Sequence, residues 1–453
     1  MFETYELIVM AMLGSFILLI FTGFPVAWVL AGVSVFFSIG AVLAYNYLDA
    51  DTYFLTDWNI FGIVVQRIYD QMTKWIMVAL PMFIFMGLML ERSGVAERLM
   101  VNFVNLFGRF NGGLGVAVIL IGILLAASTG IVGASVVLLA MLSLPVMLDQ
   151  KYSPAFASGI VASSGTLGIM IPPSIMLIIM ADQLSLSVGD LFMGALIPGV
   201  MLGILYIAFV VIAAWLKPSL APPKADLPPI TRAVVIETLR SVLPPLSLIL
   251  AVLGSIFFGI ATPTEASGVG ALGATILAAM NGRLSWDVLR DVSRKTTITT
   301  AFVFGIFLGA TAFAVVLRSL GGDEFIAGLL TSIPLSPGGI ILVILFIAFL
   351  AGFFLDWLEI SLILLPLVGP VVVQLGFDLT WFVVLFALTL QTSFLTPPVG
   401  FSLFYLKGVA PPEIKTTDIY KGVMPFIALQ VLAVTLVFFW EPLVLWLPEV
   451  RYG

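Results

Sequence analysis

The chain has 453 residues, of which 61% are hydrophobic and only 10% charged, less than half the charged share of an ordinary soluble domain. That composition leaves too little polar surface to cover a soluble core and predicts a membrane protein. The chain has no Cys and no His, which excludes thiol redox work, thiolate metal sites and His proton relays. The net charge of −6 indicates little about partners, and nothing suggests nucleic acid.

Nucleotide hydrolysis is disfavoured on similar grounds. The sequence contains no G-x-x-x-x-G-K-[ST] phosphate loop and no soluble segment long enough to fold a motor domain. An integral membrane enzyme is also disfavoured, because we find no recognisable pairing of a nucleophile with a base. Any energy source must therefore come from elsewhere.

Charge-free apolar runs predict ten membrane crossings. They lie at about 6–22, 26–45, 73–91, 155–184, 190–215, 241–260, 265–281, 297–317, 380–407 and 422–446. Two more apolar stretches, about 113–148 and about 338–375, each hold two segments around a polar or Gly-rich break, as two full spans or one re-entrant hairpin would. Both versions leave the orientation of the loops unchanged.

Basic residues predict that orientation through the positive-inside rule. With the N-terminus outside, 15 of the 19 Lys and Arg residues fall on the cytoplasmic side, and the four exceptions are Arg67, Lys74, Arg318 and Arg451. Both termini are then periplasmic, and the Pro-rich linker 216–240 is cytoplasmic. A single Cys at Ala221 in this linker should resist an impermeant reagent added outside.

Charged amphipathic stretches at about 57–72 and 284–295 interrupt the spans, with apolar residues on one helical face. We expect both to lie along the membrane interface. They are either solvated connecting helices or rigid arms that brace a moving domain.

The two halves of the chain carry the same Arg-Ser, Gly-Gly and Pro-Pro pairs in the same order. Arg92-Ser93 match Arg318-Ser319, Gly112-Gly113 match Gly338-Gly339, and Pro172-Pro173 match Pro397-Pro398, all at a shift of 225 or 226 residues. This predicts one repeat over 1–215, the linker 216–240, and a second repeat over 241–453. Each repeat has five crossings and a hairpin, and an odd number inverts the second repeat, as in secondary transporters.

Paired breaks inside the apolar segments are the best indication of a binding site. The first pair is ASTGIVGAS at 127–135 and GFFLD at 352–356; the second is SSGTLGIMIPPS at 163–174 and QTSFLTPPVG at 391–400. A Pro-Pro pair removes two backbone donors, so nearby carbonyls lose their helical partners and can face Na⁺, a hard ion that favours oxygen. Ordinary Pro kinks and small-residue helix contacts are the alternative interpretation.

Acidic residues also occur in the apolar segments. Asp356 and Glu359 lie in the second hairpin stretch, and charge at membrane depth is costly enough to suggest function. Solvated helix caps at a water-filled cavity would explain them equally well. Asp182 and Glu265 lie near predicted span ends and are expected at interfaces.

Taken together, the segments ASTGIVGAS, ASSGTLGIMIPPS, GDLFMGALIPG, FFLD and FLTPPVGFSLF resemble the large membrane subunit of tripartite ATP-independent periplasmic (TRAP) transporters. The likeness covers almost the entire chain. It implies an all-α polytopic fold of the ion-transporter superfamily, with a scaffold, amphipathic arm helices, two oppositely entering hairpins and an elevator-type transport domain. It also implies Na⁺ as the transported coupling ion.

The resemblance assigns site residues by position. The first Na⁺ site would use Ser128, Thr129, Gly168, Ile171 and Pro173, and the second would use Gly352, Ser393, Thr396 and Val399. Substrate is expected near Ser163, Ser164, Thr166 and Asp356. Many relatives have a more Ser-rich first tip than the Thr-Gly-Ile-Val-Gly of this chain. Because this tip has fewer hydroxyl side chains, carbonyls are favoured over side chains as its ligands.

Two protein partners follow from the resemblance: a small membrane subunit of about four spans and a soluble periplasmic protein that captures the substrate. The substrate would be a small organic anion such as a dicarboxylate, a keto acid or a sialic acid, imported across the inner membrane of a bacterium. A stand-alone Na⁺/carboxylate symporter of the same superfamily is the main alternative, and a passive channel is a weaker one.

Overall fold

The structure is a computed structural model that describes residues 3–452 except 130–131, 225–226 and 228, and except the side chains of 126–129 and 452. Helices follow one another throughout, and the described residues contain no strand. The helices are α1 (Thr4–Ile20), α2 (Val26–Leu48), α3 (Asn59–Thr73), η1 (Trp75–Val78), α4 (Ala79–Arg92), α5 (Val95–Phe107), α6 (Gly113–Thr129), α7 (Val132–Asp149), α8 (Pro154–Thr166), η2 (Leu167–Ile169), α9 (Ile175–Gln183), α10 (Val188–Leu216), η3 (Pro218–Leu220), α11 (Arg232–Phe257), α12 (Pro263–Met280), α13 (Trp286–Ser319), α14 (Gly322–Thr331), α15 (Pro337–Ala351), α16 (Trp357–Gln374), α17 (Leu379–Leu395), α18 (Phe401–Val409), α19 (Thr416–Phe439) and α20 (Pro442–Tyr452).

Within this described part, eight helical segments are long and apolar enough to cross a membrane. They are α2, η1 with α4, α7, α10, α11, α13, α16 and α19. The predicted crossing at 6–22 is the shorter helix α1, and the two predicted broken spans consist of pairs of short helices. Both predicted hairpins are also pairs of helices, α6 with α7 and α15 with α16.

Sequence signals explain where several helices begin. Thr262 accepts a hydrogen bond from the Glu265 amide, and the Glu265 carboxylate accepts one from the Thr262 amide at 2.8 Å. This capping box satisfies two backbone donors at the start of α12, with Pro263 in the first turn. Glu265 therefore lies at an exposed helix end, where the sequence placed it.

The amphipathic stretch predicted at 284–295 to interrupt the spans does not form a helix of its own. That stretch continues without a break into the predicted span 297–317, and both form the single 34-residue helix α13. No Gly or Pro occurs between Trp286 and Phe304 to stop it. The other amphipathic stretch, predicted at 57–72, does form its own helix, α3.

Two other boundaries differ from the sequence prediction. Helix α11 starts at Arg232 behind a Thr231 cap, so the last nine residues of the predicted linker 216–240 are helical. The predicted crossing 422–446 is divided, because α19 ends at Phe439 and Pro442 opens α20. Pro lacks an N–H and suits the first turn of a new helix.

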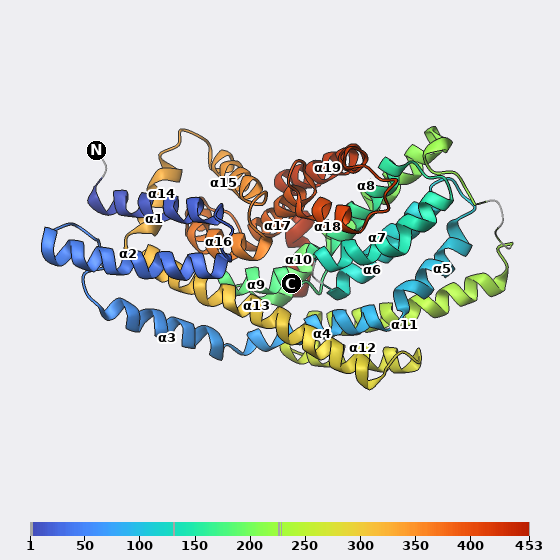
Figure 1. Ribbon diagram of the computed structural model, residues 1–453, viewed down its shortest axis with the longest axis horizontal. Helices are drawn as coiled ribbons and strands as arrows, with labels where there is room; N and C mark the ends of the chain where they lie inside the picture. The colour runs from blue at the N-terminus through green and yellow to red at the C-terminus, as the bar shows by residue number, and fades with distance from the viewer. Residues whose placement is uncertain (1–2, 130–131, 225–226, 228, 453) are drawn as a thin grey trace.

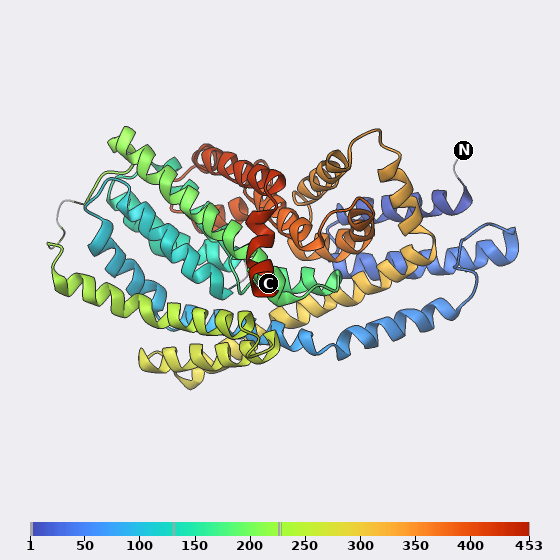
Figure 2. The ribbon, with the colours of Figure 1, turned by 180° about the vertical axis from the view of Figure 1, so that it is seen from behind.

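The helices form two layers along the long axis of the molecule. Figures 1 and 2 show α2, α3, α13, α4 and α12 along one side, and the hairpins with the broken spans on the other. In the second layer α8 packs closely on α19, and Gly159 and Gly422 bring their backbones into contact. A side chain at either position would collide with the facing carbonyl groups.

Two short helices that the sequence reading left unassigned precede the hairpins. Helix α5 follows Gly94 and α14 follows Gly321, and both glycines have positive φ angles, +72° and +81°. A left-handed backbone there suits glycine, which has no Cβ. The helices from α5 to α9 therefore recur in the same order as α14 to α18, apart from the 3-10 turn η2. The inversion of one half relative to the other remains a prediction.

Candidate functional site

The first broken span is interrupted deep in the protein. Helix α8 ends at Thr166, the turn η2 follows, and 170–174 are not helical before α9 begins. Every residue from Phe156 to Ala181 is buried. In the part of the chain that the structure describes, the carbonyls of Ile171 and Pro173 accept no hydrogen bond. Buried carbonyl oxygens of this kind are what a desolvated cation requires.

The first hairpin packs against this broken span. A Cβ at Gly122 of α6 would lie 2.8 Å from the Ser164 Cβ, and Val136 of α7 contacts Gly165. Helix α6 also packs on η2, which contains the buried Gly168. The predicted ligands Ser128 and Thr129 are the last two residues of α6, but their side chains lie outside the described residues.

The second broken span repeats this arrangement. Helix α17 ends at Leu395, 396–400 are not helical, and α18 starts at Phe401. The Ser393 hydroxyl donates a hydrogen bond of 2.7 Å to the Phe349 carbonyl near the hairpin tip. A Cβ at Gly352, the residue that caps α15, would lie only 2.5 Å from the Ser393 oxygen. The structure therefore brings the predicted residues Gly352 and Ser393 together.

The other two predicted residues of this site lie in the unwound segment itself. Both Thr396 and Val399 are half-buried. The Thr396 hydroxyl donates to the Thr392 carbonyl at 2.7 Å, which leaves its oxygen lone pairs available to accept or to bind a cation.

Asp356 and Glu359 form a helix cap at the second hairpin tip. The Glu359 carboxylate accepts a hydrogen bond from the Asp356 backbone amide at 2.7 Å, and the Asp356 carboxylate accepts one from the Trp357 backbone amide at 2.9 Å. The two acids therefore cap α16, as the capping interpretation expected, whereas the solvated, water-filled surroundings of that interpretation stay a prediction. Glu359 is nevertheless 7% exposed and lines an apolar cleft of about 620 Å³ between α2, α13 and α16.

The residues predicted near the substrate separate into two groups. Ser163 and Ser164 are fully buried, and their hydroxyls donate to carbonyls of their own helix, Gly159 and Ile160, at 2.6 Å. The Thr166 hydroxyl also donates to a carbonyl of its own helix, that of Ser163 at 2.8 Å, but it accepts a hydrogen bond from α17 as well. Among the described residues, Asp356 makes no hydrogen bond with any of these three side chains.

A buried polar cluster lies between the two broken spans and was not predicted from the sequence. Gln391 of α17 donates to the Thr166 hydroxyl at 3.2 Å, and its own carbonyl oxygen has no partner. The Tyr206 hydroxyl of α10 faces Thr166 and Gln430 without closing a hydrogen bond. Two features of the sequence could have indicated this cluster. Gln391 matches Thr166 at a shift of 225 residues, and Gln430 is an amide side chain inside an apolar span.

Solved structures with this arrangement are membrane transporters. The YdaH transporter of Alcanivorax borkumensis superposes with a TM-score of 0.60 at 14% identity, covering 97% of this chain and 98% of that one. MtrF of Neisseria gonorrhoeae gives 0.51 at 13% identity, with 84% of each chain covered. The chain therefore shares the overall fold of these two structures.

The family follows from the sequence comparison. The model of the tripartite ATP-independent periplasmic transporter DctM component matches residues 13–443, and the chain belongs to this family of large permease subunits. It is 31% identical to the C4-dicarboxylate TRAP transporter large permease of Pseudomonas aeruginosa, over 84% of this chain and 88% of the relative. It is 27% identical to the sialic acid TRAP transporter large permease of Vibrio cholerae, over 96% and 97%.

Membership settles the class of function predicted from the sequence. The chain is a transporter subunit of the bacterial inner membrane rather than an enzyme. The resemblance to TRAP large permeases is likewise confirmed.

Proposed function

We propose that this chain imports a small organic anion, in the first instance a carboxylate, in symport with Na⁺. A periplasmic binding protein delivers the anion, and a small membrane subunit of about four spans completes the complex. Relatives named for C4-dicarboxylates, sialic acid and isethionate support an anionic substrate. The isethionate relative is a DctMQ permease of which the match covers 59%, which leaves room for a fused small subunit.

One observation carries the ion-binding part of the proposal: a hairpin tip touches a broken span where helical hydrogen bonding stops. The Ser393–Phe349 hydrogen bond makes that contact, and Thr396 supplies a further oxygen one turn away. The described residues contain no group of three or more His, Cys, Asp or Glu that could hold a metal ion. Carbonyl and hydroxyl oxygens suit Na⁺, a hard monovalent cation.

The layered fold supports an elevator movement of the hairpins and broken spans against the long layer of α2, α3 and α13. We propose that the two halves are inverted repeats and that both termini face the periplasm. Helices α3 and α13 would then act as the arms along which the moving layer shifts. Alternating access through repeats of this kind is common in secondary transporters.

Uptake into proteoliposomes tests this function. The chain is reconstituted alone, with the small subunit, and with both partners, and radiolabelled succinate, N-acetylneuraminate and isethionate are used as probes. We expect uptake of one probe only with both partners and an inward Na⁺ gradient. Uptake by the chain alone indicates a stand-alone symporter, gradient-independent flux indicates a channel, and full activity with H⁺ in place of Na⁺ refutes the coupling ion.

A further inference from the structure

A polar cleft separates the arm helix α3 from the end of the first broken span. Its volume is about 390 Å³, and its walls come from α3, α9, the C-terminal part of α13 and α16. On α3 the lining residues recur at helical spacing, from Ile63 through Arg67 and Gln71 to the capping residue Lys74. One face of the arm is therefore turned toward the cleft.

The cleft gathers basic residues that are otherwise rare on this side of the molecule. Arg67, Lys74 and Arg318 all line it, together with the acidic Asp70 and Asp182, and they are three of the four basic residues predicted to lie on the periplasmic side. Arg318 is paired with Asp323 at 2.7 Å. Among the described residues, the exposed guanidinium of Arg67 has no hydrogen-bond or ion-pair partner.

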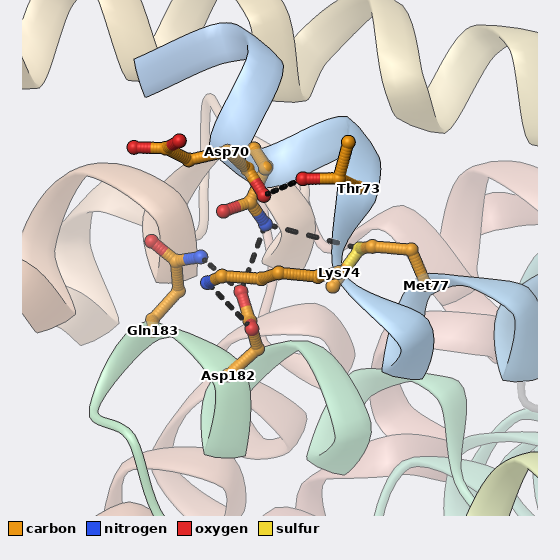
Figure 3. Close-up of polar contacts among 7 residues, drawn as sticks. Asp70, Thr73, Lys74, Met77, Asp182 and Gln183 are labelled. Atoms are coloured by element: carbon orange, nitrogen blue, oxygen red, sulfur yellow. Dashed lines mark hydrogen bonds and ion pairs between the residues drawn. The ribbon is translucent and has the colours of Figure 1, made fainter. Parts of the chain in front are cut away.

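Lys74 is held by a carboxylate that has other partners. Its ammonium lies 2.8 Å from Asp182, whose side chain is only 5% exposed. Asp182 also accepts hydrogen bonds from the amides of Gln71 at 2.9 Å and Gln183 at 3.2 Å (Figure 3). Those two amides remain when the ammonium leaves, so they offset part of the cost of leaving the Asp182 carboxylate without its cation. The Lys74 side chain itself is 40% exposed, so it can reach another anion.

We propose that this cleft is the outer receiving site for the acidic group of the transported anion, a carboxylate or a sulfonate. Arg67 attracts the anion, and Lys74 transfers from Asp182 to it. This inference rests on the proposed function, since it assumes an anionic substrate that arrives from the periplasm. The exchange removes one of the two contacts that the arm makes with Asp182 at the end of α9, while the hydrogen bond from Gln71 stays in place.

Thiol labelling tests the site without any transport measurement, because the chain has no native Cys. Thr311→Cys places one thiol in the cleft wall, and Ser332→Cys places a control thiol at an exposed position outside it. Both are treated from outside with sulfonatoethyl (anionic) and trimethylammonioethyl (cationic) methanethiosulfonate. We expect the anionic-to-cationic rate ratio at Thr311→Cys to exceed the control ratio about fivefold, and less in high salt.

Charge variants make the test specific. Arg67→Gln should return the ratio at Thr311→Cys to the control value, whereas Arg451→Gln, which removes the fourth outer basic residue, should leave it unchanged. Succinate or isethionate at millimolar concentration should slow the anionic reagent at Thr311→Cys alone. A ratio equal to the control, or one insensitive to Arg67→Gln, overturns the receiving site. Failure of uptake with the ratio intact would instead count against the proposed function.

Discussion

Gly352→Ala tests whether the second hairpin tip must touch the broken span. The backbone of Gly352 is helical and accepts alanine without conformational cost, so the effect comes from the added Cβ. That atom would lie 2.5 Å from the Ser393 oxygen and 2.8 Å from its Cβ, where contacts of about 3.5 Å are normal. The tip must therefore move by roughly 1 Å, and overpacking of this kind costs about 1–3 kcal/mol.

If Na⁺ binds across this contact, that cost appears as about 5- to 150-fold weaker activation by Na⁺. The assay is uptake against Na⁺ concentration in the reconstituted complex. Gly408→Ala is the matched control, because a Cβ there meets no atom within 4 Å. Ser393→Gly should partly rescue Gly352→Ala by removing both clashing atoms. A normal Na⁺ response in Gly352→Ala would refute the placement of the ion at this tip.

Two further substitutions examine the same ion site and the topology. Thr396→Val removes a hydroxyl oxygen and should weaken Na⁺ activation by roughly 1–3 kcal/mol. Thr392→Val, the control, loses the same kind of bond to its own helix and should not weaken it. Equal Na⁺ activation curves for the two variants would remove Thr396 from the site. For the linker, Ala221 is fully buried, so the thiol belongs at the exposed Ser219. Ser219→Cys should resist an impermeant reagent in intact cells, and ready labelling would reverse the predicted orientation.

The sequence predicted the hairpins and broken spans because their signals are local. Charge-free runs, Gly-rich tips and Pro-Pro pairs follow from backbone chemistry that each segment carries by itself. A Pro-Pro pair does not always interrupt a helix, however, since Pro244-Pro245 lies inside the continuous helix α11. The carbonyls left unpaired there belong to Arg240 and Ser241, which line an open cleft, so solvent can satisfy them without unwinding.

Contacts between distant segments could not be predicted from the sequence. The pairing of Lys74 with Asp182 joins residues 108 positions apart, and the Gln391–Thr166 bond joins residues 225 apart. Neither can be derived from periodicity, which reports only the face that a helix buries. The sequence did contain one usable hint, because Thr166 and Gln391 occupy matching positions in the two halves, 225 residues apart. Ser163 and Ser164 carried no such hint, and their hydroxyls turn back to their own helix.

The Thr166–Gln391 pair can be separated from mere packing by a double-mutant cycle. Gln391 is fully buried and already carries an unpartnered carbonyl, so Thr166→Val would leave its amide unpartnered as well. Stranding a buried polar group costs about 1–3 kcal/mol, whereas replacing both partners with apolar groups is close to neutral. Thermal unfolding in detergent should therefore show Thr166→Val destabilised and Thr166→Val/Gln391→Leu restored. A double variant as unstable as the single would show that the cost comes from lost packing, because only a hydrogen-bonded pair predicts recovery when its second member is removed.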